Sequence, residues 1–313
     1  MKKKSDRVRF HFGTPATMTA DYLIALLPVY FWSIYAFGAW STHYLLSLSF
    51  TASLVFLLGM RFAKKEKIHP RIYLRAIVTG FTLAFLMPAN APIWLVILGA
   101  FIALVPYELP FVGDYLRRYV HPIALSVVIL SLLFQTMKAD NSSLLIKSVS
   151  PVTPLASLMD GFLPEEGIFD LLLGRHSGLI GEVSVLMIVI GGVYLYLRRQ
   201  LQPEGPLSML ATLALISYIF PVSGYRLEFL TVQLFTGAVF FTAIYLMPFC
   251  DTMPMTRYGR IIMGVLSGAL TYVFRRYVDC VDGVFLAFII SVAVVRLVEP
   301  FLPIKYTNWK GEF

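Results

Sequence analysis

The fold is decided by stretches such as residues 178–197, GLIGEVSVLMIVIGGVYLYL, in which a single carboxylate interrupts an apolar run. A helix of about 20 residues covers the hydrocarbon core of a bilayer. In that medium every backbone amide must be paired within the protein, so only helices and closed barrels cross it. The length of this stretch favours a helix.

Apolar windows of similar length recur along the chain, which is 58% hydrophobic and only 14% charged, with a mean hydropathy of +0.75. In soluble domains about a quarter of the residues are charged. The sequence therefore predicts an all-α polytopic membrane protein that forms a single membrane domain over residues 1–313. We expect about ten transmembrane helices, near residues 20–38, 43–62, 72–88, 92–107, 119–136, 178–197, 206–221, 229–248, 258–274 and 283–299.

The distribution of Lys and Arg predicts the orientation of these spans, because cytoplasmic loops carry an excess of both. With the N-terminus inside, nineteen of these residues fall in cytoplasmic segments and six in outer segments, and Arg296 lies within a span. Both termini are then cytoplasmic, and the longest loop, residues 137–177, is external. The net charge of +8 follows from this topology and needs no nucleic-acid partner.

Two apolar segments, residues 79–88 and 236–248, resemble each other, since both begin with Thr-Gly and end with Met-Pro. Five spans separate them, and an odd number of spans reverses the orientation. An inverted repeat of five plus five helices would explain this similarity and would place functional groups between its two halves. Chance similarity between apolar segments is the alternative.

Few charged residues fall within or at the edges of the predicted spans. Glu182 is a candidate for an ion or proton pathway, because a carboxylate inside a membrane is costly unless it is paired, hydrated or neutralised. The alternative is a helix-start carboxylate, favoured by the helix dipole. Asp21 and Glu228 are expected to be solvated at the interface, and Arg296 is expected to pair with Glu299.

Gly264 and Gly268 have the spacing of a helix-packing motif. The five histidines lack any metal-ligand spacing, and Cys250 and Cys280 fall on opposite sides in this topology. We therefore expect neither a disulfide nor a metal site ligated by this chain alone.

The longest polar stretch includes Ser150-Pro151-Val152-Thr153-Pro154 in the external loop. A hydroxyl that accepts a flavin through a phosphodiester must be reachable by the modifying enzyme and must lie close to an apolar surface. Thr153 meets both requirements. A simple turn between two prolines is the alternative interpretation.

Three regions together resemble the D subunit of the Rnf electron-transport complex, which is related to the B subunit of the sodium-pumping NADH:quinone reductase. Order and spacing agree over roughly residues 20–300. The similar stretches are residues 76–84 with 88–94, residues 153–156 with 172–174 and 178–194, and residues 237–241 with Thr252, Pro254, Thr256, Gly259 and 283–285.

The resemblance implies an inner-membrane, multi-pass subunit of an ion-translocating ferredoxin:NAD oxidoreductase that moves Na⁺ or H⁺. It implies a fold of inverted repeats similar to urea transporters. It also implies FMN joined covalently to Thr153, flanked by Ser150 and Pro154, and leaves room for a second, non-covalent flavin. The partners would be the A, B, C, E and G subunits, a flavin transferase and membrane lipid.

This chain differs from the family pattern within the flavin-attachment motif. Lys147 stands where the family has an aspartate, and Pro151-Val152 replaces Gly-Ala. Two alternative functions are therefore kept: a solute channel or transporter of the same fold, and a cofactor-free scaffold of a flavin-based electron-export assembly. No soluble dinucleotide domain is evident, so the chain would act as a subunit of a translocase rather than as an enzyme alone.

Overall fold

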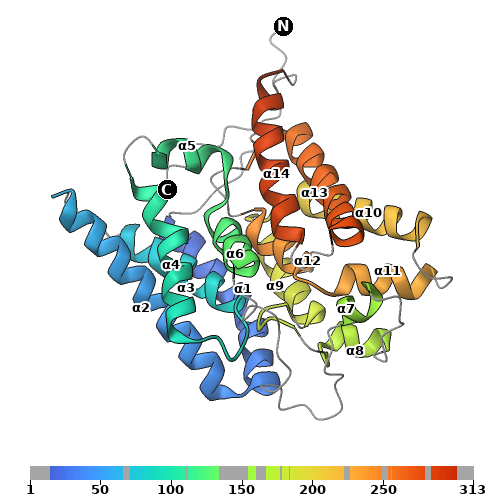
Figure 1. Cartoon of the computed structure of the whole chain (residues 1–313), viewed down its shortest axis with the longest axis horizontal. Coiled ribbons are helices and arrows are strands. Elements are labelled where there is room, and N and C mark those ends of the chain that lie inside the picture. The colour runs from blue at the N-terminus through green and yellow to red at the C-terminus, as the bar shows by residue number, and fades with distance from the viewer. Residues whose placement is uncertain are drawn as a thin grey trace, which may run out of the picture.

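The computed structural model describes residues 15–65, 71–109, 112–133, 154–159, 167–176, 178–182, 184–221, 226–248, 253–254, 256–278 and 283–301. All regular structure in this part of the chain is helical, which confirms the all-α class (Figure 1). Ser150, Thr153, Cys250 and Cys280 lie outside the described residues.

The helices follow one another in three groups. The first is α1 (Pro15–Phe37), α2 (Ala39–Ala63), α3 (Arg71–Phe85), α4 (Ile93–Glu108), α5 (Val112–Tyr119) and α6 (Pro122–Leu133). Two short helices of the predicted external loop come next, α7 (Pro154–Met159) and α8 (Ile168–Leu173). The last group is α9 (Val185–Leu197), α10 (Glu204–Ile219), α11 (Arg226–Phe235), α12 (Val239–Phe241) with a π-helical turn (Thr242–Leu246), α13 (Arg257–Tyr277), α14 (Gly283–Val298) and a 3-10 turn (Glu299–Phe301).

Each of the ten predicted spans overlaps at least one of these helices. By length and composition, two of the described helices, α1 and α2, could cross a membrane alone, and the bent pair Arg226–Phe235 and Val239–Leu246 would make a third. Six shorter apolar helices of 10–17 residues accompany them: α3, α4, α6, α9, α10 and α14. The membrane-helical character is thus supported, while the number ten, the inverted repeat and the urea-transporter-like fold remain predictions.

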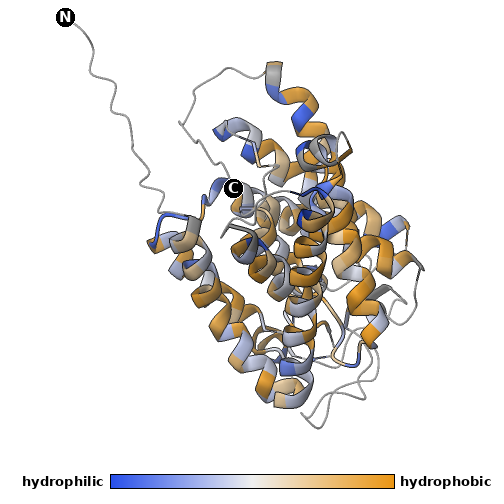
Figure 2. Ribbon diagram, turned by 90° about the vertical axis from the view of Figure 1, so that its left-hand side faces the viewer, coloured by the Kyte–Doolittle hydropathy of each residue, from blue (hydrophilic) through white to orange (hydrophobic). Residues whose placement is uncertain are grey.

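Apolar residues run along most of the helical ribbon, and hydrophilic residues gather mainly towards helix ends (Figure 2). Large apolar side chains such as Phe31, Trp40, Val55 and Phe62 are exposed on α1 and α2. In water such a surface would promote association, whereas in a bilayer it faces acyl chains of matching polarity.

The glycine pair of α13 packs closely against α10. A Cβ on Gly264 would lie 2.0 Å from Ser208 Oγ and 2.3 Å from the main-chain oxygen of Gly205, and one on Gly268 would lie 2.5 Å from the oxygen of Met209. The packing interpretation of this motif is therefore confirmed.

Two predicted spans differ from the structure. Residues 178–182 form a turn, and α9 begins only at Val185, because Ser184 caps it by accepting from the Met187 amide. The span at 229–248 is broken, and its two parts meet at an angle of 53°.

Candidate cofactor and ion site

The segment that follows the predicted flavin-bearing residue is held tightly. Thr153 itself lies outside the described residues, but α7 begins directly after it at Pro154, a residue type favoured at the first helical position. Pro154 and Leu155 are both buried. In Figure 1, α7 and α8 lie beside α11, and α7 contacts α11. Both short helices therefore pack onto the helical bundle, while the external position of residues 137–177 remains a prediction.

The break between α11 and α12 lies against this segment. Gly237 and Ala238 have φ angles of +69° and +55°, in the left-handed region where glycine is favoured. A Cβ on Gly237 would lie 2.3 Å from Arg275 Nη2 and 3.2 Å from Leu155 Cδ2. Leu155 and Arg275 therefore both lie against the same glycine of the break.

Arg275 holds the broken end of α11 from the neighbouring helix α13. Its Nη1 donates to the main-chain oxygen and to the side-chain oxygen of Gln233, at 2.7 and 3.1 Å. Its Nη2 donates to the main-chain oxygens of Thr236 and Gly237, at 3.0 and 2.9 Å. The last carbonyls of a helix lack partners within it and attract cations. A guanidinium with 1% exposure supplies both the donors and the charge.

Arg275 is one of the six Lys and Arg residues that the sequence assigns to outer segments, and the structure places its side chain inside the bundle rather than in a loop. The side chain is buried within the last turn of α13, and it makes a discontinuous helix possible inside an apolar bundle. Irregular backbone at membrane depth requires such internal partners.

A second irregular region lies on the other side of α12. The Gly181 amide donates to the Phe85 oxygen at 2.7 Å, and the Ile180 amide donates to the Met87 oxygen at 3.3 Å. A Cβ on Gly181 would lie 2.6 Å from Phe85 Cβ and 3.1 Å from Phe241 Cε2. The turn at 178–182, the end of α3 and α12 therefore meet at this glycine.

Glu182 lies in this turn, two residues before the N-cap of α9, and is half-buried. Its position just ahead of the helix corresponds to the helix-start interpretation and corrects the view that it stands inside a span. Its Oε1 would be only 2.6 Å from a Cβ on Gly178, so the side chain folds back over that glycine. The turn keeps the carboxylate at the N-terminal end of α9, where the helix dipole favours negative charge.

A row of aromatic rings extends from this point into the bundle. The ring centroids of Phe85 and Phe241 are 6.4 Å apart, and those of Phe241 and Tyr245 are 5.1 Å apart. Tyr22 follows at 5.8 Å from Tyr245 and shares a hydrogen bond of 2.7 Å with Thr82. The two similar segments, residues 79–88 and 236–248, are thus in contact through Phe85 and Phe241.

Asp21 is buried and paired, which corrects the expectation of interfacial solvation. It lies 3.1 Å from Arg198 Nε, accepts from the Tyr194 hydroxyl at 2.9 Å and accepts from the Gln200 amide. The hydrogen bond to Asp21 and its negative charge raise the pKa of the Arg198 guanidinium. These contacts join α1 to the end of α9, so Asp21 has a structural role here.

The remaining candidates behave as ordinary membrane-protein side chains. Arg296 pairs with Glu299 at 2.8 Å, as predicted, and Glu228 is exposed at the start of α11. Among the described residues, no group of three or more His, Cys, Asp and Glu side chains could hold a metal ion.

Residues 10–306 match the model of the NQR2, RnfD, RnfE family. The chain is 27% identical, over 95% of its length and 92% of the relative's, to the D subunit of the Na(+)-translocating ferredoxin:NAD(+) oxidoreductase complex of Acetobacterium woodii. It is 25% identical, over 74% of each chain, to the D subunit of the proton-translocating ferredoxin:NAD(+) oxidoreductase complex of Clostridium ljungdahlii. It is 26% identical, over 88% and 86%, to the D subunit of the ion-translocating oxidoreductase complex of Methanosarcina acetivorans.

The family match extends across the described helices and the irregular regions between them. The chain therefore belongs to the NQR2, RnfD, RnfE family.

Proposed function

We propose that this chain is the D subunit of an ion-translocating ferredoxin:NAD oxidoreductase of the inner membrane, and that it carries FMN covalently on Thr153. Relatives whose names describe such subunits match most of the chain. The observation that carries the cofactor proposal is that Leu155, two residues after Thr153, packs against Gly237 at the break that Arg275 holds.

The residues around this point suit an anionic, planar group. Pro154 and Leu155 bury the chain next to the attachment residue, which limits how far a group on Thr153 can move. The buried guanidinium of Arg275 and the side chain of Leu155 both lie against Gly237, and the positive charge of Arg275 would favour a phosphodiester nearby. Bound FMN would supply an electron carrier that works in one-electron or two-electron steps.

Ser150 and Pro154 would fix the backbone on either side of Thr153. The hydroxyl of Thr153 would lose its proton and bond to the phosphorus of the FMN group of a flavin adenine dinucleotide, and AMP would leave, in a reaction that a flavin transferase catalyses. Arg275 would keep its hydrogen bonds to α11 throughout, so its role is to hold the break and its charge in place.

The ion pathway in this proposal passes the turn that carries Glu182. The turn, the end of α3 and α12 are irregular backbone in contact with one another, and exposed carbonyls of such regions coordinate ions in broken-helix transporters. Glu182 would supply the charge that accepts Na⁺ or a proton. Neighbouring subunits, including those of the A, B, C, E and G types, would provide the ferredoxin and NAD sites.

The cofactor proposal is tested by the flavin fluorescence of the denatured chain in a gel after co-expression with a flavin transferase. Wild type and Ser150→Ala should fluoresce, whereas Thr153→Val should be dark, because valine has the same shape and no hydroxyl. Fluorescence that survives in Thr153→Val would refute the attachment site. A dark wild type would favour the solute channel or the cofactor-free scaffold.

The ion pathway is tested by Na⁺ and H⁺ uptake into vesicles that contain the whole complex. Glu182→Gln should lower uptake by at least about ten-fold while the flavin fluorescence of the chain stays unchanged, because binding of the ion would depend on the negative charge of the Glu182 carboxylate. Gly178→Ala keeps the carboxylate but displaces it and should lower uptake less. Glu228→Gln removes an exposed charge and should have no effect. Equal uptake in wild type and Glu182→Gln would exclude Glu182 from the pathway.

A further inference from the structure

A groove lies beside the corner between the first two helices of the chain. Gly38, whose φ is +90°, is the only residue between α1 and α2. The cavity of the groove has a volume of about 560 Å³ and is lined by residues of α1 from Leu23 to Tyr30, by residues of α2 from Trp40 to Phe50, and by Phe81 and Phe85 of α3. Such a volume is typical of a site that binds a ligand.

The walls of this groove suit an apolar ligand. None of the described residues that line it is Asp, Glu, Lys or Arg, and the sequence has none of these residue types from position 22 to position 60. Phe50 and Phe81 close the end farthest from Gly38, with ring centroids 6.4 Å apart. Gly80 brings α3 close to α2 there, because a Cβ on it would lie 2.7 Å from Phe50 Cα. A charged group would lose its hydration in such a place, so the groove favours an uncharged one.

The end of the groove near Gly38 is more polar. The Tyr30 hydroxyl and His43 Nδ1 share a hydrogen bond of 3.0 Å. Trp40, in the first turn of α2, is 85% exposed. Tryptophan is enriched where a membrane meets water. This end therefore matches the membrane interface, and the end at Phe50 matches the hydrocarbon core.

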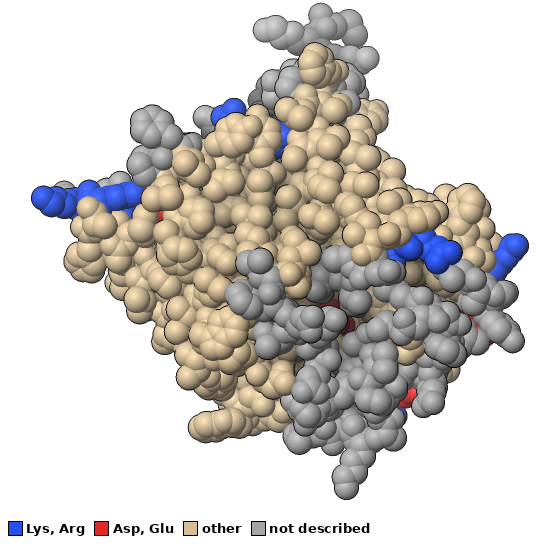
Figure 3. Space-filling view, in the orientation of Figure 1, with Lys and Arg blue, Asp and Glu red and all other residues tan. Residues whose placement is uncertain are grey.

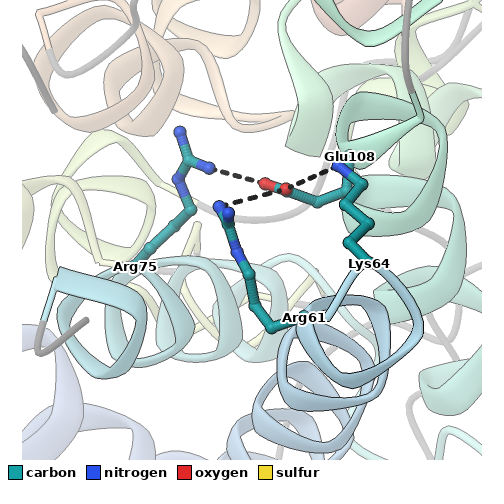
Figure 4. Close-up of polar contacts among 4 residues, drawn as sticks. All are labelled: Arg61, Lys64, Arg75 and Glu108. Carbon is teal, nitrogen blue, oxygen red and sulfur yellow. Dashed lines mark hydrogen bonds and ion pairs between the residues drawn. The ribbon is translucent and has the colours of Figure 1, made fainter. Parts of the chain in front are cut away.

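The opposite end of α2 is charged. Arg61 Nη2 and Lys64 Nζ lie 3.3 and 3.7 Å from Oε2 of Glu108, a buried residue in the last turn of α4, and Arg75 Nη1 of α3 lies 2.8 Å from its Oε1. Figure 4 shows the four side chains pointing toward one another from the three helices. In Figure 3 a basic group lies at the left edge of the molecule, over the end of α2, and the described surface directly below it shows no charged side chain. The charged cluster and Trp40 thus mark the two ends of an apolar length of α2.

The groove has the length of one leaflet of a bilayer. From Trp40 to Phe50, α2 rises about 15 Å. The hydrocarbon core of a bilayer is about 30 Å thick, and the acyl chains of each leaflet fill half of it. A chain that enters at Trp40 and ends at Phe50 therefore matches the groove in length as well as in polarity.

We propose that this groove binds one acyl chain of a phospholipid. The ester end of the chain lies beside Tyr30 and His43, and its terminal methyl group points towards Phe50. Ile24, Leu27 and Phe31 are exposed along one face of α1, and Leu27 also lines the groove, so the groove is continuous with a surface that faces acyl chains. The groove selects its ligand by the length of the chain and not by the charge of the headgroup.

The test uses the full-length chain, purified in neutral detergent and stripped of lipid. Native mass spectrometry follows the binding of dioleoyl phosphatidylcholine, of dihexanoyl phosphatidylcholine and of dioleoyl phosphatidylglycerol. The two dioleoyl lipids should bind with similar affinity, because the walls of the groove lack charge. The dihexanoyl lipid should bind at least about ten-fold more weakly, because its short chains bury far fewer methylene groups.

Two substitutions fill the groove from opposite walls. Leu27→Trp on α1 and Ser47→Phe on α2 each place a ring where the acyl chain would lie. Each should weaken the binding of dioleoyl phosphatidylcholine at least about ten-fold, which is the effect of excluding two methylene groups.

Each substitution has a matched control on the same helix. Ile24→Trp changes a residue with the same exposed fraction as Leu27, 44%, that does not line the groove. Thr51→Phe removes a hydroxyl that donates to a main-chain oxygen of α2, as Ser47→Phe also does. Both controls should bind the lipid as wild type does, and all four variants should keep the unfolding temperature of wild type.

Three results would overturn the proposal. Equal binding of the dioleoyl and dihexanoyl lipids would remove the role of the chain, and clearly tighter binding of phosphatidylglycerol would assign selection to the headgroup. Unchanged binding in both Leu27→Trp and Ser47→Phe would place the lipid elsewhere. A dimer that both substitutions dissociate, with unchanged lipid binding, would assign the groove to a second copy of this chain.

Discussion

Arg275 and Glu108 are both buried charges, and the chain stabilises them in opposite ways. Arg275 donates four hydrogen bonds to carbonyl and amide oxygens at the end of α11, all of them uncharged. Glu108 is instead surrounded by three cations from two other helices. Neutral dipoles stabilise the first charge, and opposite charges stabilise the second.

The difference shows what each place can do. Carbonyl oxygens bound to Arg275 are fixed in direction, so this charge determines the backbone conformation of the break. At Glu108 three partly exposed cations converge on one carboxylate, so this charge links α2, α3 and α4 rather than fixing a backbone conformation. The first region holds the break in the backbone in place, and the second joins α2, α3 and α4.

Replacement of Arg275 should have the largest effect on stability. Arg275→Met leaves the carbonyls at the end of α11 without these donors in a buried environment, so the free energy of unfolding in detergent should fall by about 3 to 5 kcal/mol. Arg275→Lys keeps the charge but loses the forked arrangement of N–H donors, so its free energy of unfolding should lie between those of wild type and Arg275→Met. A change below about 1 kcal/mol in Arg275→Met would mean that the break is held by other contacts.

Gly237→Ala should be the next most damaging change. An alanine at this position would have to keep the left-handed φ of +69°. Its Cβ would also lie 2.3 Å from the Arg275 guanidinium, which is itself held by four hydrogen bonds. We expect a loss of about 2 to 3 kcal/mol in the same unfolding measurement. Gly59→Ala is the matched control, because nothing lies within 4 Å of its Cβ. Equal stability of the two variants would contradict the geometry of the break.

Glu108→Gln should cost less than either change at the break. The three cations lose their common carboxylate, but each can turn toward water, so we expect a loss of about 1 to 2 kcal/mol. Glu228→Gln, which removes an exposed carboxylate from α11, should change stability by less than about 0.5 kcal/mol. If Glu108→Gln proved as damaging as Arg275→Met, the contrast between the two regions would be wrong.

Lys64→Gln should have the smallest effect on stability. Its contact with Glu108 is 3.7 Å long and the side chain is partly exposed, so the loss should stay below about 0.5 kcal/mol. Arg75→Gln, which removes a contact of 2.8 Å, should cost more. Thermal unfolding of both variants beside wild type checks this order, and a reversed order would count against the arrangement around Glu108.

The sequence predicts the helices well because apolar length is a strong signal. It does not predict the break at Gly237, because residues 229–248 read as one apolar run and the cause lies on another helix. Arg275 was misplaced for the same reason: by sequence it resembles a loop charge, and only packing shows that it lies inside. The predicted span at 178–197 includes Glu182, but Ser184 caps α9, so the helix begins at Val185 and Glu182 lies in the turn before it.

The cluster at Glu108 also depends on contacts between distant segments. A signal was nevertheless present, since Arg61, Arg75 and Glu108 all lie close to span ends that the predicted topology places on the same side. An acidic residue at such an end, among many cations, could have been predicted to pair. The sequence could not predict which cations Glu108 would contact, because the apolar pattern does not determine how α2, α3 and α4 pack against one another.

The most direct test of the account is peptide mapping by mass spectrometry of the full-length chain after co-expression with a flavin transferase. We predict that the peptide containing Thr153 gains the mass of one FMN less one water, and that Lys147→Asp, which restores the family's acidic residue, increases the modified fraction. An unmodified peptide in both chains, or an FMN on another residue, would contradict the proposal.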